Sequence, residues 1–366
     1  MTQNKRPTIR TVAKYVDLSP TTVSLALRGD DSIPAETRNK VLAAAKELNY
    51  EFVPRKRKSE RKRVKRVVYV IKDYGDQPVI ANPFYGQILN GVEQACREAD
   101  ANLSFVVMPH EYPDTTELPV AITENVDGII MSSPYPRSIV DRVASISHCP
   151  LVLVDNTFPG SPYDTVMADD YGGGYRVTEH LLEQGHRRIM VVTGLARSRE
   201  IPPSFQERYR GYCAACTYWG IDLLPPAVVP EYIDISPSDR REPFQGWLGG
   251  ILAEHPQVTA IFGVGDLFAI AALQSLQNLG YRIPADFSVV GYDNYEEMAT
   301  IIKPPLTTIH SYKRAMGQVA VQRLLSRMEG DDTPPLYISV GANLVTRAST
   351  NLAPVREPSM MTNDRK

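Results

Sequence analysis

Short apolar runs alternate with helical segments from residue 67 to residue 347, and this alternation limits the fold more than any other feature. Strands are predicted at residues 67–71, 105–108, 128–132, 151–155, 188–193, 260–263, 288–292 and 344–347. Helices are predicted at residues 85–99, 171–184, 206–219, 244–255, 267–279 and 313–328. Alternating strands and helices form parallel sheets with helices on both faces, and such sheets bind ligands at the carboxyl ends of their strands. We therefore expect an α/β body that holds a ligand site.

The residues before this body carry a different pattern, that of three short helices. The first is predicted at residues 9–16, with Thr8 as a candidate cap. Ser19 and Pro20 stand in the order of an N-cap and a first helical residue, and Gly29 has the place of a C-terminal stop. Only Asp17-Leu18 lies between the first helix and this cap, which predicts a helix-turn-helix. The third helix is predicted at residues 34–48, and its inward residues are expected to be Val41, Leu42, Ala45 and Leu48.

Charge divides the chain in the same way. Residues 1–66 hold 17 Lys/Arg and 7 Asp/Glu, whereas the rest of the chain holds 23 and 35. A basic head on an acidic body indicates that the head contacts a polyanion. Nine of the twelve residues 55–66 are Lys or Arg. Taken alone, such a run is more typical of a solvated linker than of an element that reads DNA.

The exposed start of the second helix offers short hydroxyl side chains that can reach base edges or phosphates, and basic residues surround it. A small helical bundle used for packing or dimerisation is the alternative, and these surface residues argue against it. Lys5, Arg6 and Arg38 add to the basic surroundings. The candidate DNA-contacting residues are Thr8, Arg10, Ser19, Pro20, Thr21, Thr22, Ser24, Leu25, Arg28, Tyr50, Arg55 and Arg57.

The stretch from Thr8 to Tyr50 resembles the N-terminal headpiece of the LacI/GalR transcription regulators. A V-A-x-x-x-x-x-S-x-x-T-V-S core, a later T-R-x-K-V and a closing L-N-Y all match in order. The body resembles the effector domain of the same family, which has a periplasmic-binding-protein type I fold. Its matching landmarks are Asn82-Pro83-Phe84-Tyr85, Val126-Asp127-Gly128-Ile129-Ile130, Gly185-His186-Arg187-Arg188-Ile189, Arg208-Tyr209-Arg210-Gly211-Tyr212, Val289-Val290-Gly291-Tyr292-Asp293, Pro305-Leu306-Thr307-Thr308 and Leu344-Val345-Thr346-Arg347. The resemblance implies an all-α headpiece followed by two doubly wound α/β lobes, with the chain crossing between lobes near residues 188, 307 and 335.

Three departures from the family pattern bear on DNA recognition. Leu25 stands where the family has an Arg that reads a guanine, and a Leu can touch only a thymine methyl. Pro34 replaces the Ser that caps the third helix, so that capping passes to Ser32 or to no residue. Ser59 replaces the Leu that wedges into the minor groove. Basic side chains of the linker either follow a narrow minor groove in its place or form only a disordered tether.

The resemblance also implies an effector site between the lobes. Phe84 and Tyr85 are placed to stack on a sugar ring or a base, and Arg208 begins the R-x-x-G pattern whose Arg grips hydroxyls or a carboxylate. Asp293 and Asp266 follow strands, but Asp266 equally suits the N-cap of the next helix. Asp169 lies in the family's D-N-x-x-G region, here Asp169-Asp170-Tyr171-Gly172-Gly173, and is also explained as a cap. A sugar is the expected ligand, with a nucleoside or another small metabolite left open.

Motifs of catalysis are missing from the sequence, and no cofactor or metal is expected. Cys213 and Cys216 have the spacing of a redox pair, but they fall inside a predicted helix and no second pair completes a zinc site. The chain has no Walker loop, no G-x-S-x-G and no H-E-x-x-H. No apolar run approaches the roughly 20 residues of a membrane span. Four cysteines without framework spacing and a start without an apolar signal segment predict a cytoplasmic protein that is not an enzyme.

These patterns together predict a one-component transcription regulator of the repressor type. The expected parts are a DNA-binding headpiece at residues 1–53, a basic hinge at 54–66, an effector-binding and dimerisation domain at 67–351 and a tail at 352–366. A homodimer is expected on a pseudo-palindromic operator, with an effector changing the lobe angle and thereby the spacing of the paired linkers. Whether the effector induces or corepresses, and whether tetramers form, stays open. A sugar-binding transport protein or an enzyme on the same scaffold are the alternatives; the basic head argues against the first and the lack of a nucleophile against the second.

Overall fold

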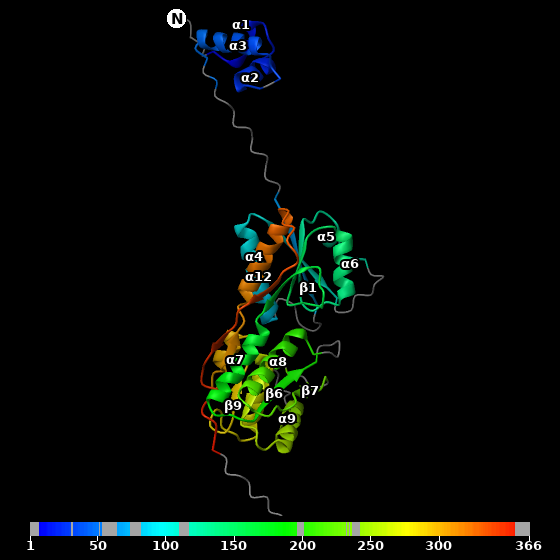
Figure 1. The fold of residues 1–366 in the computed structure, drawn as a ribbon, viewed down its shortest axis with the longest axis vertical. Coiled ribbons are helices and arrows are strands. Elements are labelled where there is room, and N and C mark those ends of the chain that lie inside the picture. The colour runs from blue at the N-terminus through cyan, green and yellow to red at the C-terminus, as the bar shows by residue number, and fades with distance from the viewer. Residues whose placement is uncertain are drawn as a thin grey trace, which may run out of the picture. The chain divides into compact units, whose positions relative to one another are not determined.

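The computed structural model describes residues 7–30, 32–50, 52, 64–73, 82–109, 117–195, 201–231, 233, 235 and 242–355. The chain forms two compact units, residues 1–63 and residues 64–366, which we call the head and the body (Figure 1). Each unit has its own buried core.

The head consists of three helices, α1 (Ile9–Val16), α2 (Pro20–Arg28) and α3 (Ala35–Glu47). Val12, Val23 and Val41 are fully buried at its centre. Thr8 caps α1 and Ser19 caps α2 through side-chain hydrogen bonds, and Gly29 ends α2 with a φ of 79°. These features confirm the predicted helix-turn-helix.

In the third helix, one buried position differs from the sequence prediction, and the structure decides between the two capping alternatives. Leu42 was expected to point inward but is 47% exposed, and Ala44 takes the buried position instead. The inner face of α3 follows Val41, Ala44, Ala45 and Leu48 at helical spacing, and Leu42 lies one residue, about 100°, off that face. Pro34 precedes α3 without any side-chain cap, because the Ser32 hydroxyl donates to Asp30 instead. Among the residues that the structure describes, no side chain therefore takes over the capping role.

The first lobe of the body is built on a parallel six-stranded sheet with the order β11-β5-β4-β3-β1-β2. Its strands are β1 (Arg66–Lys72), β2 (Asn102–Met108), β3 (Gly128–Ser132), β4 (Leu151–Val154), β5 (Asp164–Ala168) and β11 (Tyr337–Val340). Helices α4 (Pro83–Glu98) and α12 (Lys313–Met328) lie side by side on one face, and α5 (Val120–Thr123) and α6 (Arg137–Ser147) belong to the other (Figure 1). Successive side chains of a strand point to opposite faces of the sheet. One face of β1 therefore packs against α4 and α12 through Val67, Tyr69 and Ile71, and the other packs against α6 through Val68 and Val70.

The second lobe contains a parallel four-stranded sheet with the order β7-β6-β8-β9. Its strands are β6 (Ile189–Gly194), β7 (Ala227–Val229), β8 (Ala260–Gly263) and β9 (Ser288–Val290). Its helices are α7 (Asp170–Glu183), α8 (Pro203–Tyr218), α9 (Glu242–Glu254), α10 (Asp266–Asn278) and α11 (Glu296–Ile301). An antiparallel pair, β10 (Thr308–His310) and β12 (Asn343–Val345), adjoins this sheet through a bridge between Val290 and Thr307. Both sheets confirm the expected α/β class.

The chain passes between the lobes at positions other than those expected. The first crossing is at Asp169 rather than near 188, because α7 already packs Val177 and Leu181 into the core of the second lobe. The second lies at Ser311-Tyr312, four residues later than expected, between β10 and α12. The third lies at 341–342 rather than near 335, because β11 still pairs with β5 of the first sheet. Sequence periodicity predicts a helix without saying which sheet it covers, and that is why these positions were misplaced.

Seven elements were not predicted, namely α5, α6, α11, β5, β7, β10 and β11. Three of the strands have only three or four residues, too few to show a periodic pattern. Within the described part of the chain, no helix is both long and apolar enough to cross a membrane.

Candidate functional site

A buried guanidinium lies at the centre of the body. Arg208, from α8, is 2% exposed. Its Nε donates to Asp170 Oδ1 at 2.8 Å, its Nη2 to Asp293 Oδ1 at 3.0 Å, and its Nη1 to the Val264 carbonyl at 2.6 Å. Its Cζ lies 3.7 Å from the ring centroid of Tyr292, a cation–π distance. Although burial opposes the charge, the carboxylates of Asp293 and Asp170 hold the pKa of Arg208 above its usual value.

Glycines place this arginine by letting α7 and α8 approach closely. A Cβ on Gly174 would lie 2.2 Å from the carbonyl oxygen of Arg208, and one on Gly211 would lie 2.2 Å from that of Tyr171. A Cβ on Gly173 would likewise lie 2.2 Å from the Tyr292 hydroxyl. The glycine run at 172–174 thus has a packing role. It brings Asp170, at the start of α7, beside the Arg208 side chain.

Asp266 braces the loop that carries Asp293. It is fully buried, and its carboxylate accepts from the Tyr295 N–H at 2.7 Å and the Thr308 hydroxyl at 2.5 Å. Burial, and after it the negative charge of Asp293, raise the pKa of Asp266 to about 7. The N-cap alternative is wrong, because the N-cap of α10 is Gly265 and Asp266 is its first residue.

The first lobe contributes aromatic side chains to the same region. Phe84 and Tyr85 open α4, are each 7% exposed, and meet edge to face at 5.1 Å between ring centroids. The Tyr85 hydroxyl donates to Asp155 Oδ2 at 2.7 Å. Burial, with the nearby charge of Asp170, raises the pKa of Asp155 to about 7. This carboxyl group therefore belongs to the same electrostatic cluster as Arg208.

Lys313 connects the two lobes within this cluster. It is the first residue of α12 and is fully buried. Its Nζ donates to the Asp293 carbonyl and lies 6.0 Å from the Phe84 ring centroid and 5.8 Å from that of Tyr295. Burial lowers the pKa of Lys313. We call Asp155, Asp170, Arg208, Asp266, Asp293 and Lys313, with Phe84, Tyr85 and Tyr295, the cleft cluster.

The structure thus brings all five predicted effector residues, Phe84, Tyr85, Arg208, Asp266 and Asp293, into one cluster. Sequence reasoning missed Asp155 and Lys313, and it saw Asp170 only as part of a motif. Asp170 stands where the D-N-x-x-G pattern has Asn, and this extra carboxylate was the available signal. Asp169 accepts from the Gly172 N–H and is the cap of α7, as its alternative explanation held.

In the head, the predicted DNA-contacting residues differ in exposure and in role. Arg10, Pro20, Thr21 and Arg28 are exposed, and Ser24 and Leu25 are half-buried on α2. Thr8, Ser19 and Thr22 take part in capping, since the Ser19 Oγ accepts from the Thr22 N–H at 3.0 Å and lies 2.8 Å from its hydroxyl. Tyr50 packs against the head core, and Arg55 and Arg57 lie outside the described residues. Arg38 donates to the Asp30 carbonyl at 2.7 Å and so holds the loop between α2 and α3.

His186 and Cys216, two other reactive side chains, have packing roles. His186 is fully buried between the hydroxyls of Thr259 and Ser288, at 2.8 and 2.9 Å. Burial raises the pKa of Cys216 to about 11, which keeps its thiol protonated. Among the described residues no group of three or more His, Cys, Asp or Glu could hold a metal ion.

Comparison with known proteins agrees with this architecture. Residues 8–51 match the bacterial regulatory proteins of the lacI family, and residues 178–350 match a periplasmic binding protein-like domain. A ribose operon repressor from Haemophilus influenzae is 30% identical over 326 residues, covering 88% of this chain and 92% of that protein. A PurR transcriptional repressor from Mannheimia succiniciproducens is 29% identical over 345 residues, covering 93% and 98%.

Solved structures show the same fold. A complex of the transcriptional regulator CelR with cellobiose matches with a TM-score of 0.64 at 26% identity, over 94% of this chain and 100% of that one. A lac repressor dimer bound to operator and an anti-inducer matches with a TM-score of 0.63 at 22% identity, over 95% and 100%. The helix-turn-helix head and the two-lobed body therefore define a ligand-responsive DNA-binding regulator. The chain belongs to the lacI family of bacterial regulatory proteins. It is a transcriptional repressor whose DNA binding a small-molecule effector modulates, and not an enzyme.

Proposed function

We propose that this chain binds a pseudo-palindromic operator as a homodimer, with α2 of each head in the major groove, and that a sugar is its effector. The observation that supports the operator half is the surface of α2. It presents Thr21, Ser24, Leu25 and Arg28 outside a core of valines and alanines. At its N-terminus the Thr21 N–H can reach a phosphate, whereas Pro20 has no N–H and those of Thr22 and Val23 already donate to Ser19. The relative solved with its operator is a dimer.

The half-buried Leu25 sets the expected sequence preference. A Leu side chain can contact a thymine methyl but cannot pair with guanine O6 and N7. We therefore expect a thymine in each half-site where an Arg at this position would select a guanine. Arg10, Arg28 and the linker residues Arg55 and Arg57 would supply phosphate contacts. Since operator DNA lies in the bacterial cytoplasm, the chain works there.

The observation that supports the effector half is the cleft cluster. Phe84 and Tyr85 come from the first lobe, Arg208 and Asp293 from the second, and Lys313 links them. A sugar offers many hydroxyls, which can exchange hydrogen bonds with carboxylates and a guanidinium, and faces that stack on aromatic rings. A ligand that binds one lobe arrangement better than the other shifts the population of operator-competent dimers. Relatives are named for ribose and solved with cellobiose.

Operator binding tests this proposal directly. The full chain and a chain starting at Val67 are titrated with DNA from upstream of its own gene, at several salt concentrations. We expect a discrete site bound only by the full chain, with a slope of log K against log salt of roughly −0.9 for each neutralised phosphate. If the linker follows the DNA, this slope should become less steep in a triple variant that combines Arg55→Ala, Arg57→Ala and Arg61→Ala. Equal binding by both chains would contradict a DNA-reading head.

The effector half needs its own measurement. Ribose, cellobiose and a purine base are added to the operator complex, and the operator affinity is measured at each concentration. One of the sugars should change the affinity, and Asp293→Asn should weaken that response without changing operator affinity in its absence. A response to the purine alone would replace the sugar by a nucleobase.

A further inference from the structure

A buried ammonium without a partner lies in the first lobe. Lys72 is the last residue of β1 and is 9% exposed. Among the described residues its Nζ has no hydrogen bond and no ion pair, and this atom is still open to solvent. Burial lowers the pKa of Lys72, and no carboxylate of the described residues opposes that shift. Because a buried charge is stabilised by pairing, an anionic group that reaches this ammonium would bind to it.

The start of α6 lies on the same face and at the same edge of the sheet as Lys72. Val68 and Val70 pack on the α6 side, and the two-residue period of a strand places Lys72 on that side as well. β1 and β3 are parallel neighbours, and Ser132 ends β3 beside the end of β1. Residues 133–136 alone separate β3 from α6, so this helix begins at the edge where Lys72 lies.

The first turn of α6 has donors to offer. The helix has eleven residues, and no side chain caps its start at Pro136. The Pro136 carbonyl accepts from the Ile139 and Val140 N–H groups, whereas those of Arg137 and Ser138 have no partner among the described residues. Unpaired N–H groups and the positive end of the helix dipole make such a turn a binding site for anions.

The segment between β3 and α6 is held in place by its neighbours. The Ser133 N–H donates to the Val154 carbonyl at 3.1 Å. Asn156, which is 3% exposed, donates from its Nδ2 to the Tyr135 carbonyl at 3.3 Å. Since this segment is already ordered, an anion bound at the start of α6 would pay little conformational entropy.

We propose that Lys72 and the start of α6 form an anion site, which binds the phosphate or carboxylate group of a small molecule. The carboxylates of the cleft cluster do not neutralise it, because none of them acts on Lys72. Asp155 follows β4, and β4 and β1 lie on either side of β3, so the two strand ends are roughly 10 Å apart. One effector can thus place a sugar ring at the cleft cluster and an acidic group at Lys72, a step that rests on the proposed sugar.

Four probes test the site and separate the two kinds of acidic group: inorganic phosphate, ribose 5-phosphate, ribonate and ribose. Binding of each to the full chain is measured by calorimetric titration at constant ionic strength. Lys72→Met should weaken the binding of at least one acidic probe roughly 10- to 150-fold, the equivalent of one hydrogen bond to a charged group. It should leave ribose binding unchanged. An effect on the two phosphates identifies a phosphate as the bound group, and an effect on ribonate identifies a carboxylate.

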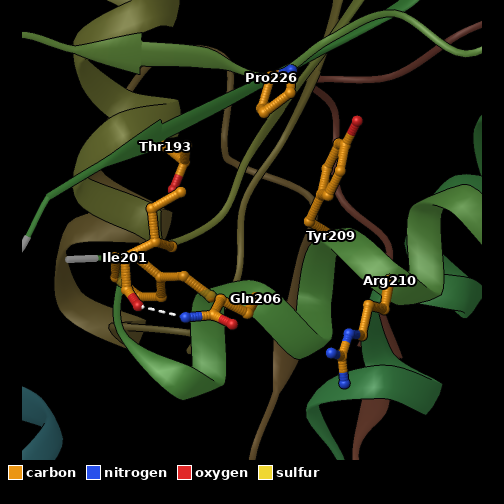
Figure 2. Close-up of a pocket in the computed structure, with 7 residues that line it drawn as sticks. Thr193, Ile201, Gln206, Tyr209, Arg210 and Pro226 are labelled. Carbon is orange, nitrogen blue, oxygen red and sulfur yellow. Dashed lines mark hydrogen bonds between the residues drawn. The ribbon is translucent and has the colours of Figure 1, made fainter.

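Arg210 provides the matched control for the loss of a cation. It lies at the wall of a pocket of about 180 Å³ beside α8 (Figure 2), and its guanidinium already donates to Glu207 at 2.6 Å. Arg210→Met should therefore leave the binding of every probe unchanged. An equal loss of acidic-probe binding in Arg210→Met and Lys72→Met would overturn the site.

A second pair of variants tests the start of α6. Arg137→Pro removes the guanidinium and one backbone N–H at the first helical position, where proline is tolerated, whereas Arg137→Met removes the guanidinium alone. Arg137→Pro should weaken acidic-probe binding roughly 10-fold more than Arg137→Met does. Equal effects of the two would remove the helix from the site. Cooperative thermal unfolding shows that each variant folds.

The anion site and the sugar proposal fail in different ways. If an acidic probe binds through Lys72 while neither ribose nor cellobiose binds, the anion site stands and the sugar is wrong. If a sugar binds but no acidic probe loses affinity in Lys72→Met, the sugar stands and the anion site is overturned. The absence of saturable binding by all three acidic probes would overturn it as well.

Discussion

The head and the cleft cluster of the body are built from contacts of very different range. In the head, Ser19 caps its own helix through Thr22, three residues on. In the cleft cluster, Arg208 bonds to Asp170 and Asp293, which are 38 and 85 residues away in the chain. The described charges of the head are exposed or hold nearby loops, whereas those of the cluster are buried. The geometry of the DNA-binding surface is therefore maintained by contacts between residues close in the sequence. The geometry of the ligand-responsive site depends on the packing of the whole body.

The largest expected effect follows from the buried arginine. Arg208→Met leaves Asp170 and Asp293 buried without their cation, which should lower the free energy of unfolding by about 3–5 kcal/mol. Urea unfolding of the full chain measures this. Arg210→Met is the matched control, because Arg210 is an exposed residue of the same helix and its loss should change stability within about 0.5 kcal/mol. Similar losses in the two variants would show that the buried ion pairs contribute little.

The next effect is a dependence on pH. Because the pKa of Asp266 is raised to about 7, the folded chain keeps a proton that the unfolded chain releases near its ordinary pKa. Stability therefore falls as pH rises between those values, and Asp266→Asn removes the part of this fall that Asp266 causes, while the part due to Asp155 remains. The difference in free energy of unfolding between Asp266→Asn and wild type should shift in favour of the variant by about 1.4 kcal/mol per pH unit across that window. A constant difference would contradict the raised pKa.

Asp164 provides a control of opposite sign. Burial alone would raise the pKa of Asp164, but hydrogen bonds from Arg327 and from the Leu336 N–H lower it below its ordinary value. Its contribution to stability is therefore present above the unfolded pKa and lost as pH falls below it. The loss of stability caused by Asp164→Asn should therefore become smaller in acid. Urea unfolding at a series of pH values measures this variant and Asp266→Asn in the same experiment.

A smaller effect is expected at the DNA surface of the head. Leu25→Arg should restore a contact to guanine and change the preferred base at one position of each half-site by about 1–3 kcal/mol. Selection from randomised operator DNA reads this change. Leu25→Met, which adds no hydrogen-bond donor, should keep the wild-type preference. If the preferred base changes equally in both variants, Leu25 does not contact that base.

The smallest effect concerns local structure alone. Ser19→Ala removes the N-cap of α2 and should cost about 1 kcal/mol, whereas Ser19→Gly should cost only a few tenths. Thermal unfolding followed by circular dichroism measures the head transition. Ser24→Ala, inside the helix, is the control. A cost as large as that of Arg208→Met would remove the contrast between the two regions.

Particular elements show how far sequence reasoning reached. The strand at 260–263 and the helix at 313–328 were predicted with the bounds that the structure has, because their apolar patterns are long or sharply bounded. Leu42 was misplaced because one step along a helix turns a side chain by about 100°. The lobe crossings were misplaced because α7 gives no local sign of the sheet it covers. Asp155 and Lys313 were missed because no pattern of neighbouring residues in the sequence indicates that they belong to the cleft cluster. Only their contacts with residues distant in the chain show it.

The sequence by itself determined the helix-turn-helix, its caps, the α/β class and the family, since each depends on residues a few positions apart. Tertiary structure alone decided that Asp170, Arg208 and Asp293 form one ion cluster. A hydrogen bond within a helical turn is set by local backbone geometry. A buried charge, by contrast, meets its partner only when distant strands and helices have packed. That packing removes water, so the charge must be stabilised by an opposite charge and by hydrogen bonds in place of water.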